Sequence, residues 1–239
     1  AAFVNAVEDG IQYLNMGFSL EEIRLFKDID SFIRAISQIQ KKFAPNVIFA
    51  PELSLKWKQN FSHIYEYVNY IFSKNWFKSI DICGKEELHY PIECYRSLYQ
   101  QAKKNGLILK AHVGEFGPAD NVMQAVSALE LDQVNHGIAA ARSEMILKYL
   151  ADKKIQLNIC PTANVQLHRI QNLSSHPIRK MFDFGIPVTI NTDNVMVFDQ
   201  TLSQEFLSLY NCGLMNEREL DQIRLQGLKQ GNTKKFSIS

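Results

Sequence analysis

The sequence predicts an α/β fold, a TIM-type (β/α)8 barrel in which only seven of the eight strands are recognisable. Three observations support this prediction. Seven short apolar runs alternate with segments of helical period, no G-x-G-x-x-G follows the first run, and polar residues collect where several runs end. An open parallel sheet usually concentrates its ligand groups at one switch point, whereas a barrel draws them from many strand ends.

The predicted strands share a short apolar run that ends close to a glycine, a proline or a polar side chain. They lie at residues 10–16, 46–52, 79–86, 107–115, 131–137, 155–161 and 186–194. Continuous apolar runs joined by helices are typical of a parallel sheet that helices cover. We expect residues 1–239 to form a single barrel domain that is incomplete at its N-terminal side, where the first strand has no counterpart.

Several predicted helices carry start and stop signals. Ser19 and Glu22 form an S-x-x-E capping box ahead of the first long helical pattern. Ser143 is a candidate N-cap for the helix that follows the 131–137 run. Asn105 and Gly106 end a helix predicted at residues 91–104.

The composition excludes several functional classes. Twenty-six basic and twenty-five acidic residues give a net charge of +1, which provides no electrostatic footprint for nucleic acid. No run of about 18 apolar residues predicts a membrane span. The four cysteines show no C-x-x-C pairing, which argues against a disulfide framework and favours a reducing cytoplasm.

The candidate chemical residues follow the predicted strands. His112 ends one strand, and Glu115 can reach the same pocket only if the chain turns between them, which Gly114 permits. His136 also ends a strand, although a lone histidine there is more often structural. Asp193 follows the apolar run VTINT, where an ionised carboxylate needs a cation or several donors. A metal would satisfy it, with His112 as a nitrogen ligand.

Four motifs, HVGE, NHG, NICPTANVQ and VTINTDN, resemble in order and spacing those of the adenosine deaminase family of the metal-dependent amidohydrolase superfamily. DICGKE resembles the fourth-strand segment of the same family, and the resemblance covers nearly the whole chain. It implies a zinc-dependent enzyme of purine salvage. The implied reaction is hydrolytic deamination of adenosine or 2'-deoxyadenosine to inosine or 2'-deoxyinosine and ammonia.

The resemblance also implies a role for each matching residue. His112 and Asp193 would be ligands of one Zn²⁺ ion. Glu115 would protonate the purine at N1 while C6 is attacked, and its carboxyl must then be protonated. His136 would orient and deprotonate the attacking water.

Two further residues would contact the purine nucleoside. The backbone of Gly84 would lie against the ring, and Asn194 would face N7. Many family members carry an aspartate at the position of Asn194. Because N7 only accepts hydrogen bonds, the amide of Asn194 suits it at any pH.

The chain departs from the family pattern in its first and second strands. The family's first strand carries a His-x-His pair that supplies two zinc ligands, and no such pair is present. We therefore expect the segment with that strand to be absent from this sequence. The segment YLNMGFS also lacks the Glu-x-Arg pattern of many members. The remaining four histidines, His63, His89, His168 and His176, are expected on the surface rather than as substitute ligands.

Two alternatives stay open. One is a truncated, non-catalytic family member that binds a purine nucleoside or a protein partner, with the open barrel edges allowing self-association or strand donation. The other is a related deaminase that acts on another aminated base or on a nucleotide. The zinc deaminases that flip bases use H-x-E with P-C-x-x-C, and Cys160-Pro161 has the opposite order with no second cysteine.

Overall fold

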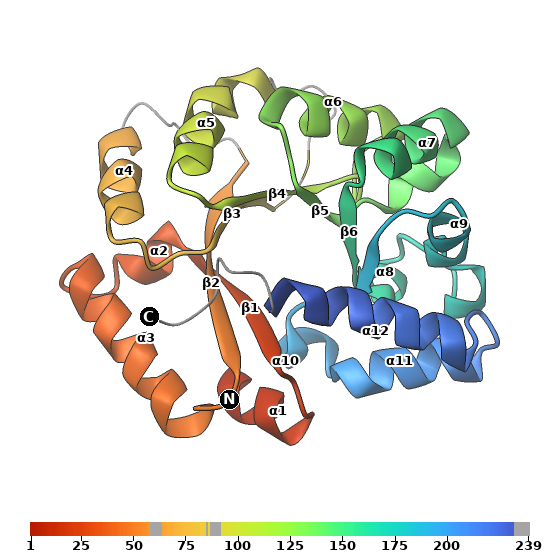
Figure 1. Cartoon of the computed structure of the whole chain (residues 1–239), viewed down its shortest axis with the longest axis horizontal. Helices are drawn as coiled ribbons and strands as arrows, with labels where there is room; N and C mark the ends of the chain where they lie inside the picture. The colour runs from red at the N-terminus through yellow and green to blue at the C-terminus, as the bar shows by residue number, and fades with distance from the viewer. Residues whose placement is uncertain (58–63, 85, 87–91, 232–239) are drawn as a thin grey trace.

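The structure, a computed structural model, describes residues 1–57, 64–84, 86 and 92–231. Its described part contains seven parallel strands in one curved sheet, in the order β1-β2-β3-β4-β5-β6-β7. The helices surround this sheet on the outside (Figure 1). The predicted α/β class and the seven strands of a TIM-type barrel are therefore confirmed.

The strands occupy the predicted runs with shifted ends. Their bounds are β1 Tyr13–Ser19, β2 Ile48–Lys56, β3 Ser79–Cys83, β4 Ile108–Val113, β5 Gln133–His136, β6 Gln156–Ile159 and β7 Val188–Ile190. The 186–194 run is the one most shortened, because its last residues form the loop that follows β7.

The helices lie between and after the strands. The α-helices are α1 Ala2–Glu8, α2 Leu20–Ile23, α3 Ile29–Phe43, α4 Tyr65–Ser73, α5 Arg96–Lys104, α6 Ala119–Leu129, α7 Glu144–Lys153, α8 Pro161–Gln166, α9 Ile178–Asp183, α10 Val195–Phe198, α11 Leu202–Asn211 and α12 Glu217–Gly231. Three 3₁₀ helices are η2 Ile92–Tyr95, η3 Ile138–Arg142 and η4 Leu173–Ser175. No helix within the described ranges has both the length and the apolar character to cross a membrane.

The predicted caps form, but the first of them caps a shorter helix than expected. The Ser19 Oγ accepts from the Glu22 N–H at 3.2 Å, and the Glu22 carboxylate accepts from the Ser19 N–H at 2.7 Å. This capping box begins the four-residue α2, and α3 begins separately where Asp28 Oδ1 accepts from the Ser31 N–H at 2.7 Å. Ser143 caps α7 as predicted.

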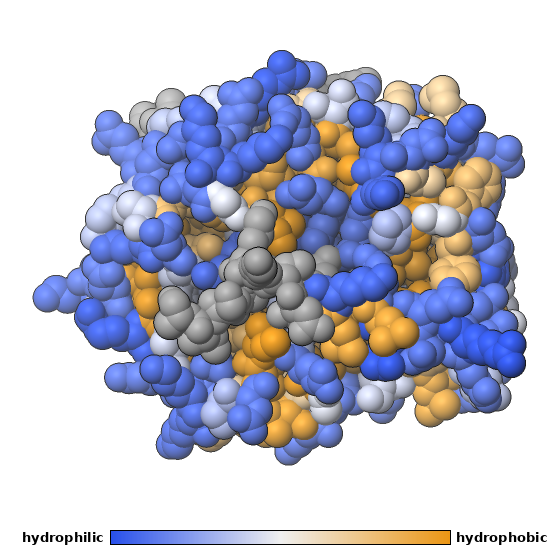
Figure 2. Space-filling model, viewed as in Figure 1, coloured by the Kyte–Doolittle hydropathy of each residue, from blue (hydrophilic) through white to orange (hydrophobic). Residues whose placement is uncertain are grey.

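The hydrophobic core lies between the outer face of the sheet and the helices. Leu53, Ile80 and Leu109 on the strands are at most 1% exposed, as are Leu98 and Val122 on the helices. In Figure 2 hydrophilic residues cover most of the outer rim, and hydrophobic ones show between the helices. This packing follows from the apolar runs read in the sequence.

The inner face of the sheet is polar instead. Lys110 Nζ lies 2.9 Å from Glu52 Oε2 and donates to Asn15 Oδ1 at 2.6 Å. The Ser79 hydroxyl donates to the same Glu52 oxygen at 2.7 Å. Lys110 and Glu52 are 4% and 5% exposed, and charged residues this buried are rare unless they are paired.

A second level of polar side chains lies nearer the carboxyl ends of the strands, and we call it the polar row. Its members are Asp81, His112, Asn135, Asn158 and Thr189, of which the last four occupy paired positions on neighbouring strands. Asp81 joins the row through its hydrogen bonds to His112 and Asn135. Asn158 Nδ2 donates to Asn135 Oδ1 at 2.8 Å, and the Thr189 hydroxyl donates to Asn158 Oδ1 at 2.9 Å. The polar row ties β3 to β7 across the inside of the barrel.

Helices rather than a strand connect the two ends of the described sheet. β1 and β7 each pair with one strand, and α12 packs against both of them (Figure 1). Gln226 of α12 donates from Nε2 to Gln156 Oε1 at 3.1 Å, and the Ser203 N–H donates to Asp9 Oδ2 at 3.1 Å. The first contact joins α12 to β6, and the second joins the start of α11 to the residue that follows α1.

We expect Lys110→Met to lower the free energy of unfolding by about 3–5 kcal/mol, because it leaves the Glu52 carboxylate buried without its cation. Urea unfolding measures the change. The double variant Lys110→Met/Glu52→Gln should recover part of the loss, and Lys148→Met on the exposed face of α7 is the matched control. A single variant as stable as the unmodified chain would contradict a structural role for the pair.

Candidate active site

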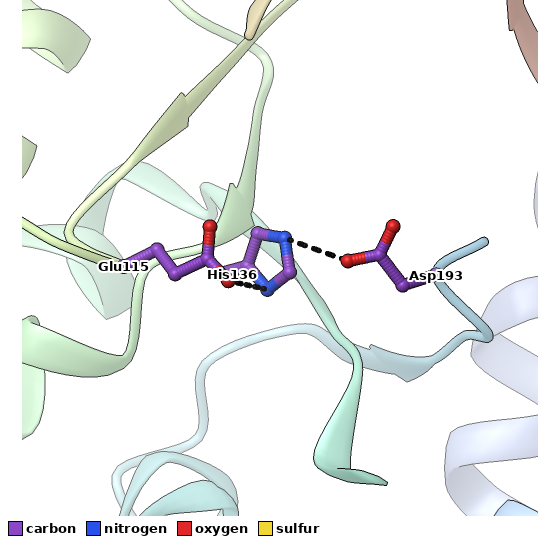
Figure 3. A group of neighbouring side chains, drawn as sticks. All are labelled: Glu115, His136 and Asp193. Carbon is purple, nitrogen blue, oxygen red and sulfur yellow. Dashed lines mark ion pairs between the residues drawn. The ribbon is translucent and has the colours of Figure 1, made fainter. Parts of the chain in front are cut away.

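Three side chains meet at the carboxyl ends of β4, β5 and β7. One ligand atom from each of Glu115, His136 and Asp193 lies within 4.8 Å of the others. His136 lies between the two carboxylates (Figure 3), with Nδ1 3.7 Å from Glu115 Oε1 and Nε2 3.8 Å from Asp193 Oδ2. The structure thus brings together three of the residues that the sequence selected.

The turn that carries Glu115 depends on Gly114. Its φ is +72°, in the left-handed region, and a Cβ there would lie 2.4 Å from Val122 Cγ2. His112 and Glu115 would otherwise point to opposite faces of the sheet. The predicted turn between them is present.

Glu86 holds this turn from the neighbouring loop, a contact that the sequence did not indicate. Its carboxylate accepts from the backbone N–H groups of Gly114 at 2.8 Å and Gly117 at 2.9 Å, and from Asn121 Nδ2 at 2.8 Å. Glu86 is 8% exposed, so these three donors replace the water it has lost. The bonds span Glu115 on both sides and fix its backbone.

The Glu115 carboxyl occupies a site that favours its protonated form. Its Oε1 is buried and has no hydrogen-bond partner within the described part of the chain. Burial raises the pKa of Glu115; the charge of His112 lowers it and that of Asp193 raises it, with a result of about 7. At neutral pH this side chain can therefore donate a proton.

His112 is anchored from below by Asp81. His112 Nδ1 is 2.8 Å from Asp81 Oδ2, and Asn135 Nδ2 donates to Asp81 Oδ1 at 3.1 Å. Because a carboxylate only accepts, Nδ1 donates and Nε2 is the nitrogen left for another partner. Burial lowers the pKa of His112, but the charge and hydrogen bond of Asp81 outweigh this and raise it to about 9.

The donor set fits a divalent cation. Asp193 supplies a carboxylate that is 31% exposed, and the carboxylate–histidine pair of Asp81 and His112 is typical of the support behind a metal-bound imidazole. The unpartnered oxygen of Glu115 points to a missing positive charge or proton beside it. Among the described residues, His112 lies outside the group of mutually close ligand atoms, which Glu115, His136 and Asp193 form.

Comparison with known proteins assigns the chain to a family. Residues 5–235 match the family model described as adenosine deaminase. The chain belongs to the adenosine deaminase family. It is 32% identical over 214 residues to a Treponema pallidum protein named as an adenosine/adenine deaminase, covering 89% of this chain and 71% of that protein.

Two further proteins define the extent of the match. The chain is 33% identical over 162 residues to an adenosine deaminase of Clostridium acetobutylicum, covering 67% of this chain and 48% of the relative. It thus spans about half the length of that relative. The structure of an amidohydrolase from Burkholderia ambifaria with bound Zn superposes with a TM-score of 0.83 at 20% identity, covering 95% of this chain and 65% of that one. That likeness shows the fold.

The two residues expected to meet the purine follow β3 and β7, at the carboxyl ends of these strands. Gly84 has a φ of +97°, and among the described residues no atom lies within 4 Å of a Cβ placed there. Asn194 is exposed and caps α10, with Oδ1 accepting from the Met196 N–H at 3.0 Å. The cap leaves the amide nitrogen as the donor of the Asn194 side chain.

One expectation about the histidines is wrong. His176 was expected on the surface, yet it is 2% exposed, because η4 just before it packs against α8 and α11 and its ring lies beside Asn164 of α8. His168 is exposed as predicted. His63 and His89 lie outside the described residues.

A buried carboxylate supports α8 behind the site. Glu205 of α11 is 1% exposed and accepts from the Thr162 N–H at 3.2 Å. Burial raises the pKa of Glu205 from 4.5 to about 7, partly offset by the hydrogen bonds from Thr162. The native state therefore binds more protons than the unfolded state between these pH values, and stability falls as the pH rises through that window.

We expect Glu205→Gln, which keeps an acceptor for Thr162 but cannot ionise, to gain stability relative to the unmodified chain as the pH is raised from about 4.5 to about 7. Urea unfolding at several pH values measures the difference. Glu66→Gln, on the exposed face of α4, controls for the loss of one negative charge. A stability difference that does not change with pH would contradict the raised pKa.

Proposed function

We propose that this chain carries the proton-transfer residues and part of the metal site of a zinc-dependent enzyme that deaminates adenosine or 2'-deoxyadenosine. The observation that carries the proposal is the Glu115 carboxyl, which is buried, unpartnered at Oε1 and raised in pKa to about 7 beside His136 and Asp193. Membership of the adenosine deaminase family supports the same reaction.

The chemistry of the purine ring explains the need for such a carboxyl. When the oxygen of water attacks C6, electron density moves to N1, and a proton donor at N1 stabilises the adduct. Glu115 would supply that proton, and the amino group would then leave from C6 as ammonia. Gly84 and Asn194 would border the bound purine, consistent with the open space at Gly84 and the amide donor of Asn194.

His112 and Asp193 would hold the cation, and His136 would contact the attacking water. When bound, a zinc ion lowers the pKa of its water from about 15.7 towards 7. His112 must lose a proton from Nε2 to bind it, because the pKa of His112 is raised to about 9. Catalytic zinc sites use three protein ligands, so a full site needs at least one ligand beyond these two.

A related substrate is the second candidate. The Treponema relative is named for both adenosine and adenine, and the contacts to Gly84 and Asn194 would read only the base. The ratio of kcat/KM for adenosine, adenine and adenosine monophosphate distinguishes the candidates. Preference for the free base or the nucleotide would replace adenosine as the substrate without changing the reaction.

We expect elemental analysis of protein purified without chelator to give near one zinc per folded chain, and His112→Ala and Asp193→Ala to lose that zinc. Near zero zinc would overturn the proposal. It would favour the non-catalytic alternative, in which the free edges of β1 and β7 take up a strand from another chain. Light scattering for molar mass and titration with adenosine would then separate a protein-binding from a nucleoside-binding role.

We expect kcat/KM for adenosine to fall as the pH rises through about 7, because the ionised Glu115 carboxylate cannot donate a proton to N1. Glu115→Gln should lower kcat by at least about 10²-fold and remove this alkaline limb. Glu144→Gln, exposed on α7, is the charge-matched control. An alkaline limb that persists in Glu115→Gln would assign the titration to another group.

A further inference from the structure

His136 heads a chain of three fully buried polar side chains that leads away from the site. His136, Asn164 and His176 are 1%, 0% and 2% exposed. Asn164 Nδ2 lies 3.1 Å from His136 Nδ1, and Asn164 Oδ1 lies 3.3 Å from His176 Nε2. The backbone carbonyl of Asn164 accepts from the Ile170 N–H at 3.1 Å, and this bond folds the following loop back towards the site.

The far end of the chain fixes the direction of every hydrogen bond in it. The Ile178 N–H donates to His176 Nδ1 at 3.1 Å, and a backbone N–H can only donate. His176 Nδ1 is therefore unprotonated. Burial lowers the pKa of His176 to about 4, so the ring is neutral and its single proton is on Nε2. That proton is donated to Asn164 Oδ1.

With Oδ1 bound to His176, the Asn164 side chain presents only its nitrogen, Nδ2, to His136. Asn164 Nδ2 donates to His136 Nδ1, so the proton of the neutral His136 ring is on Nε2, the nitrogen that faces Asp193. The opposite orientation of the amide would require both nitrogens of His176 to accept, which a neutral imidazole cannot do. Because Nδ1 accepts this bond, it carries no proton, and the His136 ring is neutral.

His112 is in the opposite state, although the two ring centroids are only 5.2 Å apart. His112 donates from Nδ1 to Asp81, whereas His136 accepts at Nδ1 and keeps its single proton on Nε2. A metal can take the place of a proton on Nε2 of His112 and leave a neutral ring, but the same exchange at His136 would leave an imidazolate with no proton on either nitrogen. The neutral His136 ring is therefore not a ligand, even though its atoms belong to the group with Glu115 and Asp193.

We propose that Asn164 and His176 are positioning residues that hold His136 as a hydrogen-bond donor through Nε2, directed at the oxygen that attacks the purine. The contact with the attacking oxygen rests on the proposed function, while the position of the proton on the ring does not. The family resemblance implies that His136 acts as a base. In this arrangement the nitrogen that faces Asp193, Nε2, already carries a proton and cannot accept one.

Asn164→Asp is the sharpest test, because a carboxylate of the same shape can only accept. The carboxylate accepts a hydrogen bond from His176 Nε2 and can only accept from His136 as well. His136 must then carry its proton on Nδ1. His176→Asn is a second variant. A short Asn side chain can keep the bond to the N–H two residues later but loses the ring that reaches Asn164. Asn211→Asp, exposed at the end of α11, controls for a new carboxylate elsewhere.

The first measurement is the two-bond ¹H–¹⁵N NMR spectrum of metal-free, substrate-free protein labelled at histidine, which separates protonated from unprotonated ring nitrogens. We expect the proton of both His136 and His176 on Nε2 in the unmodified chain and in Asn211→Asp. Asn164→Asp should move the proton of His136 to Nδ1, and His176→Asn should give His136 a mixture of both forms. A proton on Nδ1 of His136 in the unmodified chain, or no change in Asn164→Asp, would overturn the proposal.

The second measurement is turnover of adenosine by the same proteins loaded with zinc. We expect kcat to fall by about 10²-fold in Asn164→Asp with little change in KM, and less in His176→Asn. A fall of equal size in Asn211→Asp would show that an added charge anywhere, and not the position of Asn164, is responsible. If the unmodified chain shows no turnover, the proposed function fails, and the NMR result still decides the state of His136.

Discussion

The site depends on one buried carboxylate, Asp81, which is fully inaccessible to solvent on the inner face of β3. A buried ionised group is costly unless donors satisfy it, and Asp81 has two, His112 Nδ1 and Asn135 Nδ2. Asn135 is in turn bound to Asn158, and Asn158 to Thr189. The partners face the same interior only in the observed strand register, because a slip of one strand by one residue would turn its member of the row to the outer face. The polar row therefore fixes the register and the orientation of His112 together.

The candidate site residues Glu115 and His136 follow this row along the chain. Glu115 lies three residues after His112, and His136 lies one residue after Asn135, so the strands place their backbones closely. The orientation of these side chains depends on groups outside the strands. Glu86 holds the turn at Gly114, and Asn164 reaches His136 from α8. Side chains held by packing and by further hydrogen bonds keep the geometry that a reaction needs. The barrel interior acts as a polar scaffold rather than as an apolar core.

The sequence was sufficient where the signal was local. Strand order, the S-x-x-E cap at Ser19 and the turn at Gly114 follow from periodicity and from backbone preferences of a few adjacent residues. His176 could not be read in this way, since its burial depends on a loop that folds back onto another element. Asp81 gave a weak signal, a charged residue within an apolar strand, that would have indicated a buried partner. The packing of α12 against both β1 and β7 joins residues far apart in the chain, so no local sequence pattern predicts it.

Two histidines at neighbouring strand ends illustrate why residue type alone does not determine a role. Both follow apolar strands and both were selected for their position. A carboxylate below His112 makes Nδ1 a donor, whereas an amide beside His136 makes Nδ1 an acceptor and leaves Nε2 as the donor. The chemistry of each imidazole is thus decided by the hydrogen bond at one of its nitrogens. Because these partners come from β3 in one case and from α8 in the other, the fold gives opposite hydrogen-bonding states to two imidazoles whose ring centroids are 5.2 Å apart.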